Sequence, residues 1–384
     1  MKFKEQLIDA VKSSRIIYAF YYYSASLFIK ILKLFVKPDD KLVLFVSFGG
    51  RFYNESPRTL YEAMKEDPRF EGYKLVWAFR SPDDFKEVPN KVKIDGLSFF
   101  KTAMKARCWI TNVAVERGLS FKPQRTFYFH TTHTTLPKVM GIDNLDSGGF
   151  VAYNIPKIDC ICACSEYEAE KEKHMYNITS EKILLSGYPK NDNLTKVTKE
   201  EIEYLRKKIG IPAGKRIILY APTYRENSGI TQGLKIDLDK WYEILGKEYY
   251  ILFRAHPTMT SGLNLDNDDF VKDVSRYPDN TELMKVADML ISDYSGIFFE
   301  FAPLERPMFC YAYDYESYIS KRKLYFDIRQ ELPGGLLDED GLLNLIKENP
   351  SEVTTQVRKF REKYVTCYGH ATEICLNRIY DEIK

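Results

Sequence analysis

Short apolar runs alternate with helix-like stretches along the chain after Pro38. The runs are rich in Val, Ile, Leu and aromatic residues and end at polar or turn-forming residues, as buried strands do. Between them, stretches such as Pro57–Lys65 and Ser98–Arg107 carry apolar residues at helical spacing. The strands predicted in a first series are Lys41–Phe48, Tyr73–Arg80, Lys91–Asp95, Cys108–Val113, Thr126–Thr131 and Asp159–Ser165. The strands predicted in a second series are Lys182–Gly187, Arg216–Ala221, Tyr249–His256, Phe270–Ser275, Met289–Asp293 and Met308–Tyr313.

This alternation predicts an α/β fold with parallel, doubly wound sheets. The polar stretch Pro189–Glu201 separates the two series, and a length of 384 residues is sufficient for two cores. We therefore expect two Rossmann-like domains that face one another across a cleft, the first over residues 41–185 and the second over residues 186–384. The helices predicted to close the chain are Asp338–Glu348, Glu352–Tyr364 and Ala371–Ile383.

The first 40 residues predict a helix of a different kind. Residues 16–29 are largely apolar but include four tyrosines, and no small-residue cleavage site of a secretory signal follows them. Lys30 and Lys33 interrupt the run, which favours a helix in a membrane interface over one that spans the membrane. Seven Lys and Arg residues among the first 37 outnumber two acidic ones. We expect residues 1–40 to form a basic amphipathic helix on an anionic membrane surface; a helix packed on the protein's own surface is the alternative.

Composition narrows the chemistry further. A formal net charge of +2 gives no bulk electrostatic basis for nucleic-acid binding. Cys160, Cys162 and Cys164 alternate along an apolar run, so we expect them on one face of a strand as small buried thiols rather than as a zinc site. The sequence has neither a GxGxxG nor a Walker A motif, which argues against a dehydrogenase or a P-loop ATPase.

Two histidine-containing segments follow predicted strands, at the sheet edge where doubly wound proteins bind ligands. His130 and His133 lie among four threonines with no carboxylate close by in sequence, so a general base is a more economical role than a metal ligand. An imidazole that caps loop backbone is the alternative. Arg254 and His256, in the sequence FRAHP, form a cationic pair suited to a pyrophosphate.

A third polar segment, Ala287–Ala302, combines a strand, a turn and a predicted helix. Ser295 is the expected N-cap, and the free amides of the first helical turn would receive a phosphate. Glu300 lies just over one turn into this helix, where it is a candidate for ribose hydroxyls, and Arg306 adds positive charge after it. The residues of this region assigned to donor binding are Ser292, Asp293, Ser295, Gly296, Glu300 and Arg306.

Six short stretches between about Ser47 and Asp327 belong together. They are SFGGRFYNESPR (Ser47–Arg58), THTTLPKVMGID (Thr132–Asp143), GYPKND (Gly187–Asp192), APTYRE (Ala221–Glu226), FRAHP (Phe253–Pro257) and SDYSGIFFEFAPLERPMFCYAYDYESY (Ser292–Tyr318). In this order the chain resembles the CDP-glycerol glycerophosphotransferases of teichoic acid synthesis.

The resemblance implies a GT-B fold and an enzyme that transfers glycerol phosphate from CDP-glycerol to a lipid-linked teichoic acid or related polymer, releasing CMP. It implies His133 as the base that activates the acceptor hydroxyl and His256 as a contact to the donor's phosphates. It also implies a peripheral place on the cytoplasmic face of the bacterial cell membrane and no cofactor beyond the donor substrate. Assembly into a homo-oligomer is left open. Additional candidates for the site are His130, Lys138, Lys190 and Arg225.

Three departures from the family pattern keep alternatives open. The family's WHGTPLK reads THTTLPK here, and the Arg of GYPRND is Lys190, which keeps the charge without the planar fork. From its length, we expect the chain to be without the large extra N-terminal domain of the polymerising members and closer in size to the primases. The alternatives are transfer from CDP-ribitol or another activated alditol, a UDP-sugar glycosyltransferase on the same fold, and an inactive homologue that scaffolds a wall-building complex.

Overall fold

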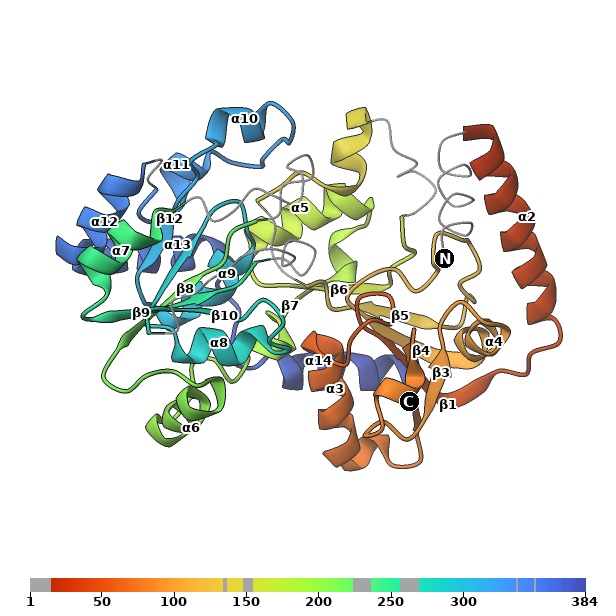
Figure 1. Cartoon of the computed structure of the whole chain (residues 1–384). Helices are drawn as coiled ribbons and strands as arrows, with labels where there is room; N and C mark the ends of the chain where they lie inside the picture. The colour runs from red at the N-terminus through yellow and green to blue at the C-terminus, as the bar shows by residue number, and fades with distance from the viewer. Residues whose placement is uncertain are drawn as a thin grey trace.

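The structure is a computed structural model, and it describes residues 15–133, 137–147, 155–223, 236–255, 269–335, 338–348 and 350–384. Two parallel β-sheets, each flanked by helices, lie next to each other along the molecule (Figure 1). The predicted α/β fold with two doubly wound sheets is confirmed.

The first sheet has seven parallel strands in the described part of the chain. They are β1 (Asp39–Val46), β2 (Lys74–Phe79), β3 (Lys91–Lys93), β4 (Ala106–Thr111), β5 (Phe127–His130), β6 (Cys160–Ala163) and β7 (Ile183–Leu185). Their order is β3-β2-β1-β4-β5-β6-β7, and Leu44 of β1 pairs with Val76 on one side and Trp109 on the other. The order reverses between β1 and β4, which is the point where such sheets bind ligands at their carboxyl edge.

The second sheet has five parallel strands within the described residues. They are β8 (Arg216–Tyr220), β9 (Tyr249–Phe253), β10 (Val271–Asp273), β11 (Met289–Ser292) and β12 (Met308–Cys310), in the order β10-β9-β8-β11-β12. Here the order reverses between β8 and β11. The sequence placed Lys182–Gly187 at the start of the second series, but the strand within it, β7, closes the edge of the first sheet by pairing with β6.

The described helices cover both sheets, and the last one returns to the first domain. They are α2 (Arg15–Lys33), α3 (Glu55–Glu66), α4 (Leu97–Lys105), α5 (Glu166–Tyr176), α6 (Lys199–Ile209), α7 (Leu238–Leu245), α8 (Asn280–Val286), α9 (Ile297–Phe301), α10 (Tyr315–Ile319), α11 (Ile328–Glu331), α12 (Glu339–Glu348), α13 (Pro350–Tyr364) and α14 (Ala371–Ile383). The α14 helix packs against α3, β4 and β5 (Figure 1). Arg69 of the first domain donates to Asn377 Oδ1 of α14 at 2.7 Å. The structure therefore assigns α14 to the first domain, whereas the sequence analysis assigned residues 186–384 to the second.

The three alternating cysteines are buried in and just after β6, as predicted. Cys162 faces α14, where its Sγ lies 3.5 Å from Sγ of Cys375. Burial raises the pKa of Cys160 to about 12, so this thiol stays protonated at neutral pH. These small side chains fill the contact between the first sheet and its returning helix.

The α2 helix stands at the edge of the first domain (Figure 1). It has two different apolar faces. One face packs on the protein: Ile29 is buried near α4, and Ser26 Oγ accepts a hydrogen bond from the Ser120 amide at 2.9 Å. The other face is open to solvent, and Phe20 and Ile16 are 76% and 83% exposed. No helix among the described residues has both the length and the apolar character needed to cross a membrane. The helix therefore packs on its own domain and also presents an exposed apolar face, while its binding to a membrane surface stays a prediction.

Candidate functional site

The loop that follows β1 turns sharply at the carboxyl edge of the first sheet. Phe48, Gly49 and Gly50 have left-handed backbone conformations, with φ of 42°, 62° and 78°. Glycine adopts such angles without strain, whereas Phe48 does so at a cost. Asn112, which follows β4, holds the loop because its Oδ1 accepts the Phe48 amide at 2.9 Å. The turn places the Phe48 ring edge-on to His133, with 5.8 Å between the ring centres.

His130 ends β5, and the protein itself occupies one of its ring nitrogens. Its Nδ1 accepts a hydrogen bond from the Thr132 amide at 3.1 Å, and only 2% of the residue is exposed. Burial, with a smaller contribution from nearby His133, lowers the pKa of His130 to about 3. The ring stays neutral and supports the loop, so the geometry of His130 matches the alternative of an imidazole that caps backbone.

His133, three residues later, has a different environment. Its Nδ1 is buried and has no hydrogen-bond partner in the part of the chain that the structure describes. Burial lowers the pKa of His133, and the positive charge of Lys190 lowers it further, while the Glu55 carboxylate and the Asn112 carbonyl oppose the shift. The lowered pKa keeps the ring neutral near pH 7, and no described protein group uses its Nδ1, which suits a general base.

Lys190 joins the two domains beside His133. It lies in a 3-10 turn, Pro189–Asn191, after the last strand of the first sheet. Its Nζ lies 2.5 Å from Glu55 Oε2 at the start of α3 and 2.9 Å from Glu300 Oε2 in α9. The same ammonium group donates to the carbonyl oxygen of His133 at 2.7 Å. One buried side chain thus contacts the first domain, the second domain and the backbone of the candidate base.

The charges of this cluster stabilise one another. Burial by itself would lower the pKa of Lys190, but the carboxylates of Glu300 and Glu55 more than offset it and raise that pKa above its ordinary value. Sequence reasoning proposed Lys190 and Glu300 separately and missed Glu55. Glu55 lies within the first of the six family-like stretches, but its backbone φ of 63° and its contact across the domains appear only in the structure.

At the carboxyl edge of the second sheet, the predicted polar residues bind backbone. Ser292 Oγ donates to the Ala221 carbonyl at 2.6 Å. Asp293 Oδ1 accepts the amides of Thr223 at 2.8 Å and Tyr294 at 2.7 Å. These bonds fix the ends of β8 and β11 next to each other, at the reversal of the strand order. Ser292 and Asp293 therefore shape this edge.

The helix predicted after Ser295 is present but short. The α9 helix begins at Ile297, with Gly296 rather than Ser295 in the N-cap position. Ser295 Oγ still accepts the Ile297 amide at 3.3 Å. Because α9 has five residues, its dipole is a small contribution, and any anion here would depend on individual amides and side chains. The buried carboxylate of Glu300 forms an ion pair with Lys190, and its contact with ribose hydroxyls stays a prediction.

Two arginines assigned to the donor lie at opposite edges of the second sheet. Arg254 follows β9 at the carboxyl edge, and its Nη1 donates to the carbonyls of Val274 at 3.1 Å and Tyr277 at 2.8 Å. Arg306 precedes β12, and its Nη1 donates to the carbonyls of Lys285 at 2.8 Å and Ala287 at 2.6 Å, at the end of α8. The structure does not bring Arg306 together with Ser292, because the two residues lie at opposite ends of neighbouring parallel strands.

Three further candidate residues are His256, Arg225 and Lys138. His256 and Arg225 lie outside the described residues. Lys138 forms an isolated bridge with Leu324, and its Nζ lies 6.0 Å from the Tyr318 ring centre, so it connects a loop of the first domain to a loop of the second. Within the described ranges, no cluster of three or more His, Cys, Asp and Glu side chains is arranged to hold a metal.

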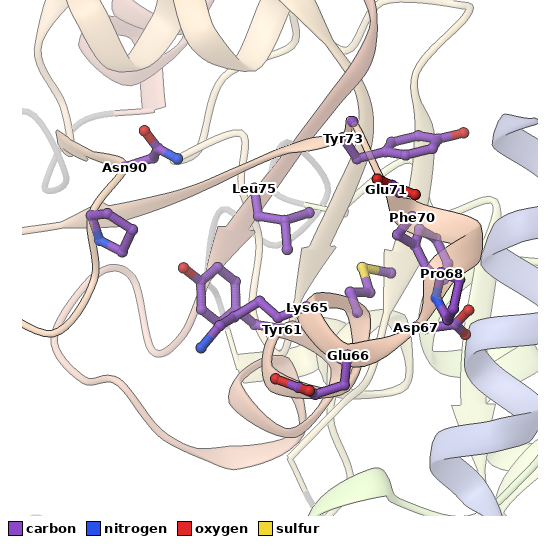
Figure 2. A pocket seen from close by; sticks show the side chains of 13 residues that line it. Tyr61, Lys65, Glu66, Asp67, Pro68, Phe70, Glu71, Tyr73, Leu75 and Asn90 are labelled. Carbon is purple, nitrogen blue, oxygen red and sulfur yellow. The ribbon is translucent and has the colours of Figure 1, made fainter.

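A cavity of about 570 Å³ lies away from these residues. It is lined by the end of α3 and the start of β2, including Tyr61, Lys65 and Leu75, and by Asn90 (Figure 2). This is the amino edge of the first sheet, opposite His133. The cavity therefore adds nothing to the site at the carboxyl edges.

Known proteins resemble this chain along most of its length. The family described as CDP-Glycerol:Poly(glycerophosphate) glycerophosphotransferase matches residues 28–381. The teichoic acid poly(glycerol phosphate) polymerase of Staphylococcus epidermidis is 32% identical over 381 residues, which cover 91% of this chain and 51% of that protein. The teichoic acid glycerol-phosphate transferase of Staphylococcus aureus is 30% identical over 334 residues, 81% of this chain and 84% of that protein. The chain thus spans about half the length of the former and most of the latter.

Two further similarities concern the fold and the donor. The structure of a histidine-to-asparagine variant of the Wall Teichoic Acid Polymerase TagF with CDPG has a TM-score of 0.81 and 30% identity, covering 90% of each chain. This likeness confirms the predicted GT-B-like arrangement of two domains. The teichoic acid poly(ribitol-phosphate) polymerase of Bacillus spizizenii is 33% identical over 181 residues, 45% of this chain and 29% of that protein.

Proposed function

The chain belongs to the CDP-glycerol:poly(glycerophosphate) glycerophosphotransferase family, and we propose that it transfers glycerol phosphate from CDP-glycerol to a lipid-linked wall-polymer acceptor. The observation that carries the proposal is the buried Nδ1 of His133, which no described protein group uses, in a ring with a lowered pKa. A neutral imidazole at the ligand-binding edge of a doubly wound sheet suits the activation of a hydroxyl group.

The proposed reaction is a displacement at phosphorus. The acceptor hydroxyl oxygen attacks the phosphorus that carries glycerol, the bond from that phosphorus to the bridging oxygen breaks, and CMP leaves with the electron pair. His133 takes the hydroxyl proton as the new bond forms. Negative charge that develops on the phosphate oxygens needs positive partners, for which Arg254 and the amides after Ser295 are the candidates in the described chain. His256 is the further candidate that the family resemblance implies.

Lys190 is proposed to keep this arrangement assembled. Its bonds to Glu55 and Glu300 tie the acceptor domain to the donor domain, and its bond to the His133 carbonyl sets the backbone of the base. Lys190 acts through His133, so it is a positioning residue. Its charge also disfavours the protonated imidazole, which keeps the base available at neutral pH.

The α2 helix supports peripheral attachment to the cytoplasmic face of the membrane as part of the proposal. Its exposed apolar face and the seven basic residues of the first 37 suit the interface of an anionic bilayer. We expect Ile16→Glu and Phe20→Glu together to weaken sedimentation with anionic vesicles and to slow turnover on a lipid-linked acceptor. Turnover on a soluble acceptor should stay the same; unchanged vesicle binding would show that this face has another role.

A donor screen tests the reaction itself. The protein is incubated with CDP-glycerol, CDP-ribitol or a UDP-sugar and a synthetic lipid-linked disaccharide, and products are identified by mass. We expect CMP release with CDP-glycerol, in the presence of EDTA as well, because side chains and amides supply the positive field. CDP-ribitol is the second candidate donor, since a ribitol-phosphate polymerase shares 33% identity over part of the chain. Transfer from a UDP-sugar alone, or no release at all, would contradict the proposal.

A further inference from the structure

Three arginines gather at the carboxyl edge of the first sheet. Arg51 lies in the sharp loop after β1, Arg80 directly follows β2, and Arg117 lies in the loop after β4. Because β2 and β4 are the two neighbours of β1 in a parallel sheet, the three loops meet at one place. This place is also where the strand order reverses.

The backbone of Gly49 brings two of these side chains close. Arg80 Nε donates to the Gly49 carbonyl at 3.3 Å, and the Arg80 amide donates to the Gly50 carbonyl at 2.7 Å. On Gly49, a Cβ atom would lie 2.8 Å from Nη1 of Arg117, and the φ of 62° is itself unfavourable for other residues. Glycine at this position therefore lets the Arg117 guanidinium lie against the loop that carries Arg51.

The cluster has more positive charge than its neighbours neutralise. Arg117 forms a two-bond ion pair with Asp95, at 2.7 and 3.0 Å. Among the described residues, no carboxylate lies within ion-pair distance of Arg51 or Arg80. Burial lowers the pKa of Arg80, the charges of Arg51 and Arg117 lower it further, and Asp95 opposes them. Three guanidinium groups and one carboxylate leave a net charge of about +2, which suits a bound anion.

We propose that Arg51, Arg80 and Arg117 form a binding site for phosphate groups of the acceptor. The proposal rests on the proposed function and adds to it how the acceptor is recognised. Guanidinium forks match phosphate oxygens in geometry as well as charge. An acceptor with phosphodiesters, as in a poly(glycerol phosphate) chain, would bring such a group with each unit.

The position of the site agrees with a path from the membrane to the base. The loop that holds Arg117 is bound to α2, since the Ser120 amide donates to Ser26 Oγ. On the other side, Phe48 of the arginine-bearing loop contacts the His133 ring. An acceptor held by the arginines would therefore lie between the helix with the exposed apolar face and the base. The donor candidates, Arg254 and the turn after Ser295, lie on the second sheet instead.

The test compares two soluble acceptors with the same terminal glycerol hydroxyl. One is a short oligo(glycerol phosphate), and the other is the same oligomer with neutral methylphosphonate linkages. In the full-length protein, Arg51→Gln and Arg80→Gln together should raise KM for the charged acceptor by about a hundredfold, roughly tenfold for each charge-assisted contact. KM for CDP-glycerol and turnover of the neutral acceptor should not change. Lys74→Gln, at the exposed amino end of β2, is the matched control and should behave as the unsubstituted protein.

Several outcomes would overturn the site. An equal KM for the charged acceptor would do so, and so would a raised KM for CDP-glycerol, which would assign the arginines to the donor. Loss of binding to anionic vesicles without acceptor, together with an unchanged KM for the charged oligomer, would assign them to lipid headgroups. Calorimetry with the charged oligomer alone tests the binding site independently of the reaction. If the protein showed no turnover but still bound the oligomer in a way that depends on Arg51 and Arg80, the binding site would be supported and the proposed function contradicted.

Discussion

The carboxyl edges of the two sheets use their polar residues in opposite ways. In the second domain, Ser292, Asp293 and Arg254 each form hydrogen bonds with backbone carbonyls or amides. In the first domain, the Nδ1 of His133 has no described partner, and Arg51 has no ion pair within the described chain. Buried polar groups are almost always paired in folded proteins. At the first edge this rule applies to His133 Nδ1, a buried nitrogen without a described partner, whereas Arg51 is exposed to solvent; both fit the substrate contacts proposed above.

The same contrast appears within three residues of one loop. His130 and His133 are both shielded, yet the Thr132 amide binds Nδ1 of His130, whereas Nδ1 of His133 has no described partner. A histidine whose nitrogen is occupied by backbone cannot take a proton there without breaking that bond. Position along the loop, rather than residue type, separates the supporting imidazole of His130 from the proposed base, His133.

The largest effect is expected for His133→Ala, which removes the proposed base. Loss of a general base lowers turnover by about a hundred- to ten-thousandfold, and we expect a fall of this size in CMP release at saturating donor. The affinity for CDP-glycerol, measured by calorimetry, should change little because the donor candidates lie on the other sheet.

His130→Asn is the matched control for this substitution. The Asn side-chain oxygen can still accept the Thr132 amide, so the loop should keep its shape and turnover should stay within about tenfold. If His130→Asn were as inactive as His133→Ala, the base would have to be reassigned.

The link between the two edges is tested by Lys190→Met. This substitution leaves Glu55 and Glu300 buried without their cation, and breaking a buried ion pair costs about 3 kcal/mol or more, which a thermal melt would register. Removing the positive charge also raises the pKa of His133, so the acid limb of the pH–rate profile should move to higher pH.

Lys190→Arg provides the matching rescue. Arginine keeps the charge, so most of the stability and the original acid limb should return. If Lys190 had only a structural role, Lys190→Met would lower the melting temperature and Lys190→Arg would restore it, but the acid limb of the pH–rate profile would be the same in both variants. Such a result would show that the charge of Lys190 does not influence the pKa of the base.

Much of the fold could be predicted because the strands and helices follow from the local pattern of apolar and polar residues. Each β-rich run became a strand. The central strands of a parallel sheet are buried on both faces and so read as continuous apolar runs, whereas the edge strands β3 and β10 are shorter and more polar. Contacts between distant segments could not be predicted in this way. Neither the return of α14 to the first sheet nor the pairing of β7 with β6 leaves a periodic signal. They follow from which apolar surfaces remain uncovered once the sheets have formed.

The site was predictable residue by residue but not as a cluster. His133, Lys190 and Glu300 were identified because they lie in family-like stretches. The role of Glu55 depends on its left-handed backbone and on its contact with Lys190, 135 positions away in sequence, and only the structure shows these. Arg306 lies in the same stretch as Ser292 but at the opposite end of its strand pair. Motifs locate residues along the chain, and only the sheet topology decides which edge they share.

Two arginines that make the same kind of contact test whether the carboxyl edge of the second sheet binds the donor. Arg306 and Arg254 each donate Nη1 to backbone carbonyls, at the amino and the carboxyl edge of the second sheet respectively. Either substitution by Ala should cost about 1–3 kcal/mol of stability in denaturant unfolding, because buried carbonyls lose a charged donor. Only Arg254→Ala should also weaken CDP-glycerol binding. Weaker donor binding in Arg306→Ala would return Arg306 to the donor site.

The smallest expected effect distinguishes the two carboxylates that hold Lys190. Glu55 opposes the lowered pKa of His133, so Glu55→Gln should lower that pKa further and move the acid limb of the pH–rate profile to lower pH. Glu300 has no such influence on His133, and Glu300→Gln should leave the limb in place although it removes the bond between the domains. Both variants lose one carboxylate of the same ammonium group, so their effects on stability should be similar. If the acid limb moved equally in both variants, the pKa of His133 would respond only to changes around Lys190. The carboxylate of Glu300 in the second domain would then influence the pKa of the base in the first domain as well as holding the two domains together.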